Sequence, residues 1–211
     1  NSKIKSSYGT GIKFPALYEL WKNQASTDLK AEQGRSYDLG IEKSFPERGI
    51  KFDITYFNHK YDNLIEGQQR TNWKPQNVSG VVRSKGIELL SQYKFNNKLN
   101  FDLNYTYTST YDGADFDDPD MGDDSNGIFT NSQMVRVPRH LVNLFTKLSP
   151  IKNLNITLQT KWSDEMRDYE NVNSATGFDQ RLSSFLVNNI VADYKLGASG
   201  YKFFFKAENI F

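Results

Sequence analysis

Apolar and polar residues alternate with a period of two over long stretches of this 211-residue chain, and this pattern constrains its fold more than any other feature. The alternation is clearest in residues 99–111, where Leu99 and Phe101 share one face while Asn100 and Asp102 share the other. Because successive side chains of a strand point to opposite faces, such a segment is predicted to be a strand with one apolar and one polar face. Nine segments of this kind are predicted: residues 4–13, 37–45, 50–58, 87–95, 99–111, 140–148, 154–162, 186–196 and 201–211.

The connections between these segments alternate between short and long along the whole chain. The short ones are residues 46–49, 96–98, 149–153 and 197–200, and the long, polar ones are about residues 14–34, 66–78, 112–137 and 163–183. Tight turns at one end of an antiparallel sheet and long loops at the other are typical of an outer-membrane barrel. Aromatic residues near the predicted strand ends suit the interfacial girdles of such a barrel: Tyr56, Tyr61, Tyr93, Phe95, Tyr107, Tyr111 and Trp162. The predicted fold class is therefore all-β, an antiparallel transmembrane β-barrel segment.

A soluble β-sandwich is the alternative fold, because its strands also alternate. A sandwich buries one face as an apolar core, and the long strands with bulky exposed aromatics would then need a cover that no predicted helix supplies.

Composition excludes other classes of protein. No run of about 18 apolar residues could form a transmembrane helix, and the net charge of +1 gives no basic field for nucleic acid. Without Cys, and with His59 and His140 as the two imidazoles, the chain has few parts for catalysis, so no enzyme is predicted.

Residues 8–20, YGTGIKFPALYEL, resemble the Y-G-x-G-F-x-x-P-x-L-x-E-L segment of TonB-dependent outer-membrane receptors, most closely in the cobalamin receptor branch. Residues 28–32 lie where that family usually shows N-P-x-L-x-P-E-x-S, and Thr27 and Ala31 stand in place of its prolines. Further matches follow in the family's order to the end of the chain. The residues that carry the resemblance are Tyr8, Gly9, Gly11, Pro15, Leu17, Glu19, Leu20, Leu29, Glu32, Gly86, Glu88, Arg136, Pro138, Asn209 and Phe211.

The resemblance implies a barrel of about 22 strands with a plugged lumen. Nine strands are too few to close it, so residues 1–211 are expected to be a C-terminal part of the barrel domain, without the plug domain. Because Asn209-Ile210-Phe211 resembles the family's penultimate strand, the last strand is expected to be absent as well. The start at Asn1, without an initiator Met, agrees with a mature segment or a piece of a longer protein.

The function implied by the resemblance is that of a receptor in the bacterial outer membrane which binds a scarce ligand and imports it with energy from TonB. Cobalamin is the ligand expected first, and a siderophore or haem is the alternative. The partners expected are this ligand, outer-membrane lipid, and the TonB complex through the missing N-terminal part. A passive porin or adhesin barrel without a plug is a rival from another class.

Ligand contacts are expected from the long loops, since binding residues commonly lie on loops held by a rigid scaffold. Aromatic and Arg side chains offer contact area and directed donors, which makes Arg70, Trp73, Tyr111, Arg167 and Tyr169 candidates; the alternative is that each is an ordinary loop or girdle residue.

No cofactor is expected. Ca²⁺ is the one candidate, because the third long loop is dense in the hard oxygen ligands that Ca²⁺ takes. Its spacing does not match a calcium-loop motif, so a solvated acidic loop is the favoured interpretation of Asp112, Asp115, Asp117, Asp118, Asp120, Asp123 and Asp124.

Overall fold

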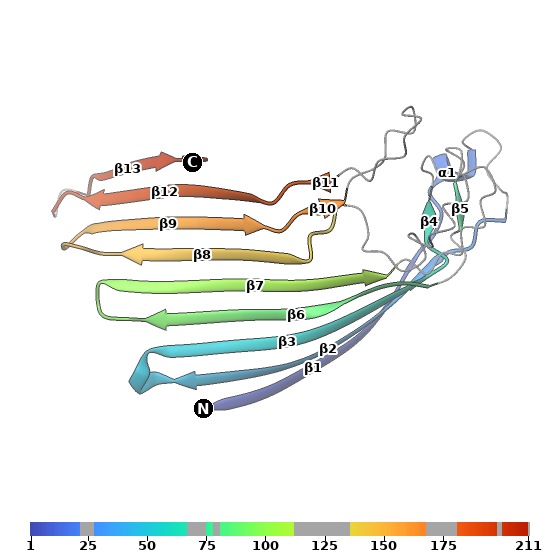
Figure 1. Ribbon diagram of the computed structural model, residues 1–211, viewed down its shortest axis with the longest axis horizontal. Coiled ribbons are helices and arrows are strands. Elements are labelled where there is room, and N and C mark those ends of the chain that lie inside the picture. The colour runs from blue at the N-terminus through green and yellow to red at the C-terminus, as the bar shows by residue number, and fades with distance from the viewer. Residues whose placement is uncertain are drawn as a thin grey trace.

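The computed structural model describes residues 1–21, 28–66, 75–77, 81–111, 136–167, 181–197 and 200–210. Nine strands form one antiparallel sheet in chain order (Figure 1), which confirms the predicted number of strands and the all-β class. Their bounds are β1 (Ser2–Lys13), β2 (Glu32–Phe45), β3 (Ile50–Asp62), β6 (Val81–Lys94), β7 (Leu99–Tyr111), β8 (His140–Leu148), β9 (Leu154–Ser163), β12 (Phe185–Lys195) and β13 (Lys202–Ala207).

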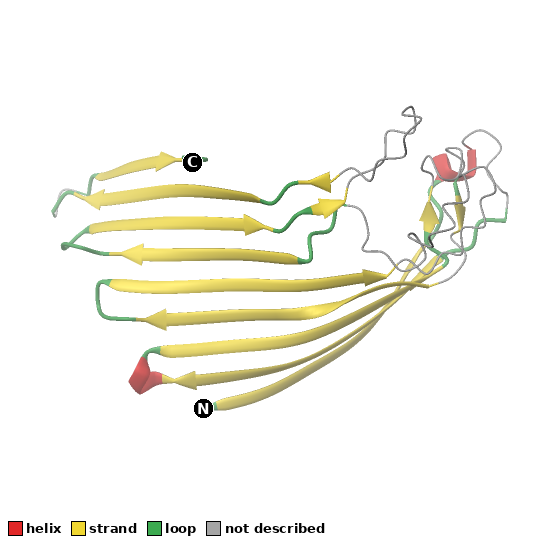
Figure 2. Cartoon of the chain, in the orientation of Figure 1, coloured by secondary structure: helices red, strands yellow, loops and turns green. Residues whose placement is uncertain are grey.

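Short elements that the sequence did not predict lie between these strands. Strands dominate the described chain, as Figure 2 shows, but the connections after β1 and β2 hold the helix α1 (Leu17–Trp21) and the 3-10 helix η1 (Pro46–Arg48). Two ladders of two residues per strand follow β3 and β9; they pair β4 (Ile65–Glu66) with β5 (Gln76–Asn77), and β10 (Met166–Arg167) with β11 (Arg181–Leu182). Among the described residues, no helix is both long and apolar enough to cross a membrane.

The strand register gathers the apolar side chains on one face of the sheet, here called the apolar face. One row of it runs across β2, β3, β6, β7 and β8 through Leu39, Tyr56, Ile87, Tyr107 and His140. Leu39 is 45% exposed and Ile87 is 44% exposed, although both lie well inside their strands. Val82 and Pro75 are the buried apolar residues of the described chain, and Val82 lies on the polar face in register with Tyr61. Nothing in the described part of the chain covers the apolar face, and an exposed apolar surface of this extent is typical of a face that contacts lipid or another protein.

Aromatic side chains gather near both ends of the apolar face. At the turn end, the ring of Tyr93 lies 6.0 Å from that of Phe95 and 6.4 Å from that of Phe101, measured between centroids. At the loop end, the ring of His140 lies 5.2 Å from that of Tyr107, and the Tyr105 hydroxyl is 2.8 Å from His140 Nδ1. These two groups have the positions of interfacial girdles.

The assignment of Tyr61 to a girdle was wrong. Tyr61 pairs with Gly34 and Val82, which lie on the polar face of the sheet. Its ring lies beside Gly34, 3.7 Å from where a Cβ of that residue would be. The error arose because the alternation in β3 continues past the apolar stretch, so a residue near the strand end has to be assigned by register and not by its distance from the loop.

The polar face carries cross-strand ion pairs between its lysines and aspartates. Lys5 Nζ of β1 reaches Asp53 Oδ2 of β3 at 2.5 Å, and Lys147 Nζ of β8 reaches Asp102 Oδ2 of β7 at the same distance. The stem of Lys5 crosses Gly40 of β2, where a Cβ would come within 2.7 Å of Lys5 Cε. Glycine therefore allows this pair to span the strand between its members.

Candidate functional site

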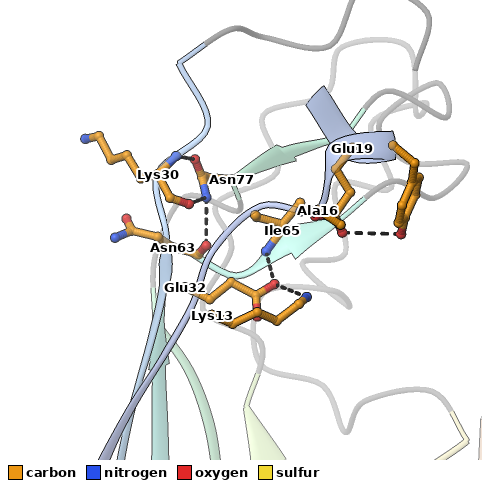
Figure 3. A network of polar contacts seen from close by, with 9 residues as sticks. Lys13, Ala16, Glu19, Lys30, Glu32, Asn63, Ile65 and Asn77 are labelled. Carbon is orange, nitrogen blue, oxygen red and sulfur yellow. Dashed lines mark hydrogen bonds and ion pairs between the residues drawn. The ribbon is translucent and has the colours of Figure 1, made fainter. Parts of the chain in front are cut away.

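The first two long connections meet beside the loop end of the sheet, where three polar side chains fix their backbones (Figure 3). We call Asn77, Glu32 and Glu19 the loop platform. Asn77, in β5, makes the most bonds. Its Oδ1 accepts a hydrogen bond from Lys30 N at 2.7 Å, and its Nδ2 donates to Lys30 O at 2.9 Å and to Asn63 O at 2.7 Å. One side chain thus joins the segment before β2, the end of β3 and β5.

Glu32, the first residue of β2, makes a second link between the two connections. Its Oε1 accepts hydrogen bonds from Lys13 Nζ at 3.0 Å and from Ile65 N at 3.0 Å. Lys13 ends β1 beyond the apolar stretch of that strand, and its hydrogen bond to Glu32 raises the pKa of Lys13. The Lys13–Glu32 pair closes the gap between the strands that flank the first connection.

Glu19 holds the start of helix α1. Its Oε2 accepts a hydrogen bond from Ala16 N at 2.6 Å, and Glu19 N donates to Ala16 O at 2.9 Å. A Glu at the third helical position that reaches back to the N-cap amide is half of a capping box. Glu19 is only 7% exposed, whereas its helix neighbours Leu17 and Trp21 are 83% and 91% exposed. The Glu19 carboxylate therefore stabilises the start of the helix. The side chains of Leu17 and Trp21 point away from it, toward solvent.

Two of the platform residues, Glu19 and Glu32, belong to the set that carries the family resemblance, and the structure gives a physical reason for both. Asn77, the third platform residue, is not among the residues that the sequence predicts for the site. An Asn followed by a strand of alternating residues is too common a signal to identify a loop anchor from sequence. The role of the loop platform is structural: it fixes the bases of the loops that are expected to hold ligand.

The predicted ligand-contacting residues are only partly placed. Arg70, Trp73, Tyr169 and the acidic residues from Asp112 to Asp124 lie outside the described residues. Tyr111 ends β7 in register with Arg83, and Arg167 lies in β10 in register with Arg181. Their role in ligand binding stays a prediction. Within the described ranges, no three His, Asp or Glu side chains gather in a way that could hold a metal ion.

One hollow of the described surface lies on the polar face, away from the platform. It measures about 440 Å³, and its wall includes Lys51, Gln92, Asp102 and Lys147. These residues lie toward the turn end of their strands, whereas the platform is at the loop end. A ligand that arrives through the long loops would meet the platform side of the sheet first.

The two histidines lie in the sheet, one on each face. His59 Nε2 on the polar face is 3.8 Å from Asp38 Oδ1, and His140 on the apolar face is joined to Tyr105. Register places the two on opposite sides of the sheet, since His140 shares a row with Tyr56 while His59 lies on the other face. The described part of the chain therefore does not bring its two imidazoles into one site.

Two protein sequences similar to this chain are informative. The Vitamin B12 transporter BtuB of Vibrio cholerae is 33% identical over 91 residues, which cover 43% of this chain and 14% of that protein. A protein described as an uncharacterized TonB-dependent receptor of Haemophilus influenzae is 25% identical over 118 residues, which cover 56% of this chain and 31% of that protein. The chain thus spans less than a third of the length of either relative.

Solved structures show the same fold over nearly the whole chain. The copper transporter OprC superposes with a TM-score of 0.74 at 15% identity, covering 99% of this chain and 31% of that one. The ferric enterobactin receptor PfeA of Pseudomonas aeruginosa superposes with a TM-score of 0.72 at 18% identity, covering 99% of this chain and 32% of that one. At these identities the likeness shows the fold alone. It confirms that the nine strands form an open part of a larger barrel.

The family model described as "TonB dependent receptor-like, beta-barrel" matches residues 1–210. Its members are transport receptors of the bacterial outer membrane, and this agrees with the location predicted from the sequence. The match covers both the nine-strand sheet and the loop platform. The chain therefore belongs to the TonB-dependent receptor β-barrel family.

Proposed function

We propose that the receptor to which this chain belongs binds a scarce ligand at the cell surface and imports it through the outer membrane with energy from TonB. The observation that carries the proposal is the match of a receptor-barrel family to residues 1–210. The loop platform supports it, because Asn77 and Glu32 fix the bases of two long connections at one end of the sheet. Such an arrangement suits loops that must hold a ligand in a defined position.

Cobalamin is the ligand that we propose first. The sequence resemblance in residues 8–20 points to the cobalamin branch, and the similarity to a vitamin B12 transporter points the same way. An iron chelate is the second candidate, because structures similar in fold include receptors for ferric enterobactin and ferripyoverdine. An outer-membrane enzyme and a passive porin are disfavoured, since the family consists of transport receptors.

Binding and uptake by cells that carry the complete receptor test the proposal. Radiolabelled cobalamin should bind to whole cells in a saturable way, and its uptake should stop when TonB is deleted while surface binding remains. Saturable uptake of an iron chelate, without cobalamin binding, would replace the first candidate by the second. Uptake that is unsaturable and unaffected by loss of TonB would instead indicate a passive pore and overturn the receptor function itself.

Two loop residues give a test of the binding site. Replacing Trp73 and Tyr169 by Ala in the complete receptor should weaken cobalamin binding by about 1–3 kcal/mol if they are aromatic anchors. Replacing Tyr8, which lies on the apolar face of β1, is the matched control for loss of an aromatic ring, and it should leave the affinity unchanged. Unaltered cobalamin binding by the Trp73→Ala and Tyr169→Ala variants would show that both are ordinary loop residues.

A further inference from the structure

A strip of uncharged polar side chains follows β7 on the polar face of the sheet. Its four members, counted from the loop end, are Thr110, Thr108, Thr106 and Asn104. They occupy every second position of one strand, so all four belong to the same face. We call these four residues the uncharged strip. It covers about 20 Å of the strand, starting at the loop end.

The neighbouring strands leave the uncharged strip almost free of charge. One of its register partners on β6 and β8 is ionised, namely Glu88, which lies opposite Thr106. The remaining partners are Ser84, Gly86, Leu90, Leu141 and Asn143. Within the described ladders, no Lys or Arg is in register with the strip. An anionic ligand would therefore find no cation among these neighbours.

The polar face of β1, β2 and β3 is charged by contrast. Lys5 and Asp53 form the cross-strand ion pair described above, and Lys51 Nζ lies 3.2 Å from Glu42 Oε2. A ligand that crossed this part of the wall would have to separate such ions from each other or from water, which costs free energy for each ion. The uncharged strip has no ion pair to disturb.

The lower end of the uncharged strip opens into the hollow of about 440 Å³ described above. Asn104 belongs to both, and the wall of the hollow continues toward the turn end with Gln92 and Phe145. Asn104, Thr106 and Thr108 are partly exposed, whereas Thr110 is buried at the loop end. The strip and the hollow thus form one continuous surface that runs from the loop end of the sheet toward its turn end.

Hydroxyl and amide side chains suit the passage of a polar ligand that carries no net charge. A Thr hydroxyl both donates and accepts hydrogen bonds, and an Asn amide offers a donor and an acceptor. Such groups replace the water that a ligand amide or hydroxyl loses, either directly or through a bridging water. A site along a path must also bind weakly enough for release, which uncharged groups satisfy more readily than a row of ions.

We propose that the uncharged strip and the hollow form one wall of the path by which the ligand crosses the barrel, and that this ligand presents amide or hydroxyl groups and is not an anion. The inference rests on the proposed transport function. It adds the side of the lumen that the ligand follows and the chemical class of the ligand. An amide-bearing ligand such as cobalamin fits this wall, and an anionic iron chelate does not.

Chemical modification of an introduced cysteine in the full-length receptor tests the path. The chain has no Cys, so Thr106→Cys adds a single thiol to it, which a bulky water-soluble methanethiosulfonate reagent can modify. Modification should slow TonB-dependent uptake of radiolabelled cobalamin at least about tenfold, equivalent to about 1.4 kcal/mol on the barrier. Binding of cobalamin to whole cells should stay unchanged.

The matched control is Ser7→Cys, which lies on the polar face of β1, four strand spacings or about 19 Å across the sheet from β7. Its modification should leave the uptake rate unchanged. The heat-induced mobility shift of a folded barrel on a gel checks that each variant is folded, and mass spectrometry checks that modification is complete. If Thr106→Cys does not fold, Asn104→Cys takes its place and decides in the same way.

Each outcome bears on the inference. Equal loss of uptake in the two modified variants, or no loss in modified Thr106→Cys, would overturn the proposed path while the receptor function stands. TonB-dependent uptake of an anionic iron chelate by this receptor would overturn the ligand class. A complete receptor that neither binds nor imports a ligand would overturn the proposed function, and this inference with it.

Discussion

Gly86 marks the point where the sheet leaves least room for a side chain. A Cβ there would lie 1.9 Å from Tyr107 O and 2.6 Å from Phe57 Cζ, so both the backbone of β7 and a ring of β3 would have to move. The ring of Phe57 covers the strand glycine, an arrangement that shields exposed backbone in sheets. The place of Gly86 in the family motif thus has a packing explanation that the sequence alone did not reveal.

Gly86→Ala is therefore expected to destabilise the folded receptor by about 1–3 kcal/mol through overpacking. Gly11→Ala is the matched control, because Gly11 lies in β1 of the same sheet and its Cβ would meet nothing within 4 Å. Urea titration of the full-length receptor in vesicles measures both free energies of unfolding. Similar losses for the two variants would show that Gly86 is not held by the contacts described.

Asn77→Ala is expected to loosen the bases of the first two long connections, because it removes three hydrogen bonds to backbone groups of Lys30 and Asn63. Two of the three hydrogen bonds are exposed and the third is part-buried, so each contributes about 0.5–1.5 kcal/mol. Limited proteolysis on intact cells should cut residues 14–31 and 63–80 faster than in the wild type. Ligand affinity should fall as well.

The matched control for this change is Asn96→Ala. Asn96 also binds backbone, accepting hydrogen bonds from Lys98 N and Leu99 N, but it lies in a turn at the other end of the sheet. Its loss should leave proteolysis of the long connections unchanged. Faster cutting of the long connections in both variants would point to general destabilisation and not to the platform.

The long strands could be predicted from sequence because one alternating pattern runs through each of them. β7, predicted as residues 99–111, has those bounds in the structure, whereas β2 begins at Glu32 and not at residue 37. Beyond the apolar stretch of β2 the outward positions hold Gln33 and Arg35, so the alternation that marks a strand is lost although the ladder continues. β13 ends at Ala207 and not at Phe211, since Asn209 has a φ of 52°.

The short elements and the site could not be predicted in the same way. The ladders β4–β5 and β10–β11 have two residues per strand, which is too short for any period to appear. Helix α1 has five residues, and its start depends on the contact between Glu19 and Ala16. The loop platform joins Lys30 to Asn77, which are 47 residues apart in the chain. Only the fold brings such groups together.

Within β7, the same substitution is expected to cost far more on one face than on the other. Leu103 pairs with Leu144 on the apolar face, and its neighbour Asn104 pairs with Asn143 on the polar face. Leu103→Arg should cost about 2–4 kcal/mol because it places a charge in the lipid near mid-bilayer, whereas Asn104→Arg should be far milder. The free energy of unfolding in lipid vesicles measures both. Equal losses would contradict the assigned faces.

The sheet as a whole is open at both sides. β1 and β13 are its edge strands, and within the described chain neither has a second partner. Lipid cannot satisfy the unpaired backbone groups of such an edge, so the nine strands need further strands of the same barrel to be stable in a membrane. Expressed alone, residues 1–211 are expected to aggregate or insert poorly, and they should show no saturable ligand binding.

The connections of the complete barrel should be accessible from opposite sides of the membrane. An epitope tag placed within residues 112–137 of the full-length receptor should be reached by antibody on intact cells, because long loops of outer-membrane barrels are extracellular. A tag at residues 96–98 should not be labelled by antibody until the outer membrane is permeabilised. Equal labelling of the two tags on intact cells would contradict the proposed orientation.

The platform has an evolutionary consequence. Asn77 binds the N and O atoms of Lys30 and the O atom of Asn63, and Glu32 binds the N atom of Ile65, so these partners contribute main-chain groups that nearly every amino acid has. Residues of the long connections can therefore be substituted during evolution while Asn77 and Glu32 keep their hydrogen bonds to the main chain. Descendants of one barrel could change the molecule that they capture by substitution and insertion in the connections, while the strands below remain as they are.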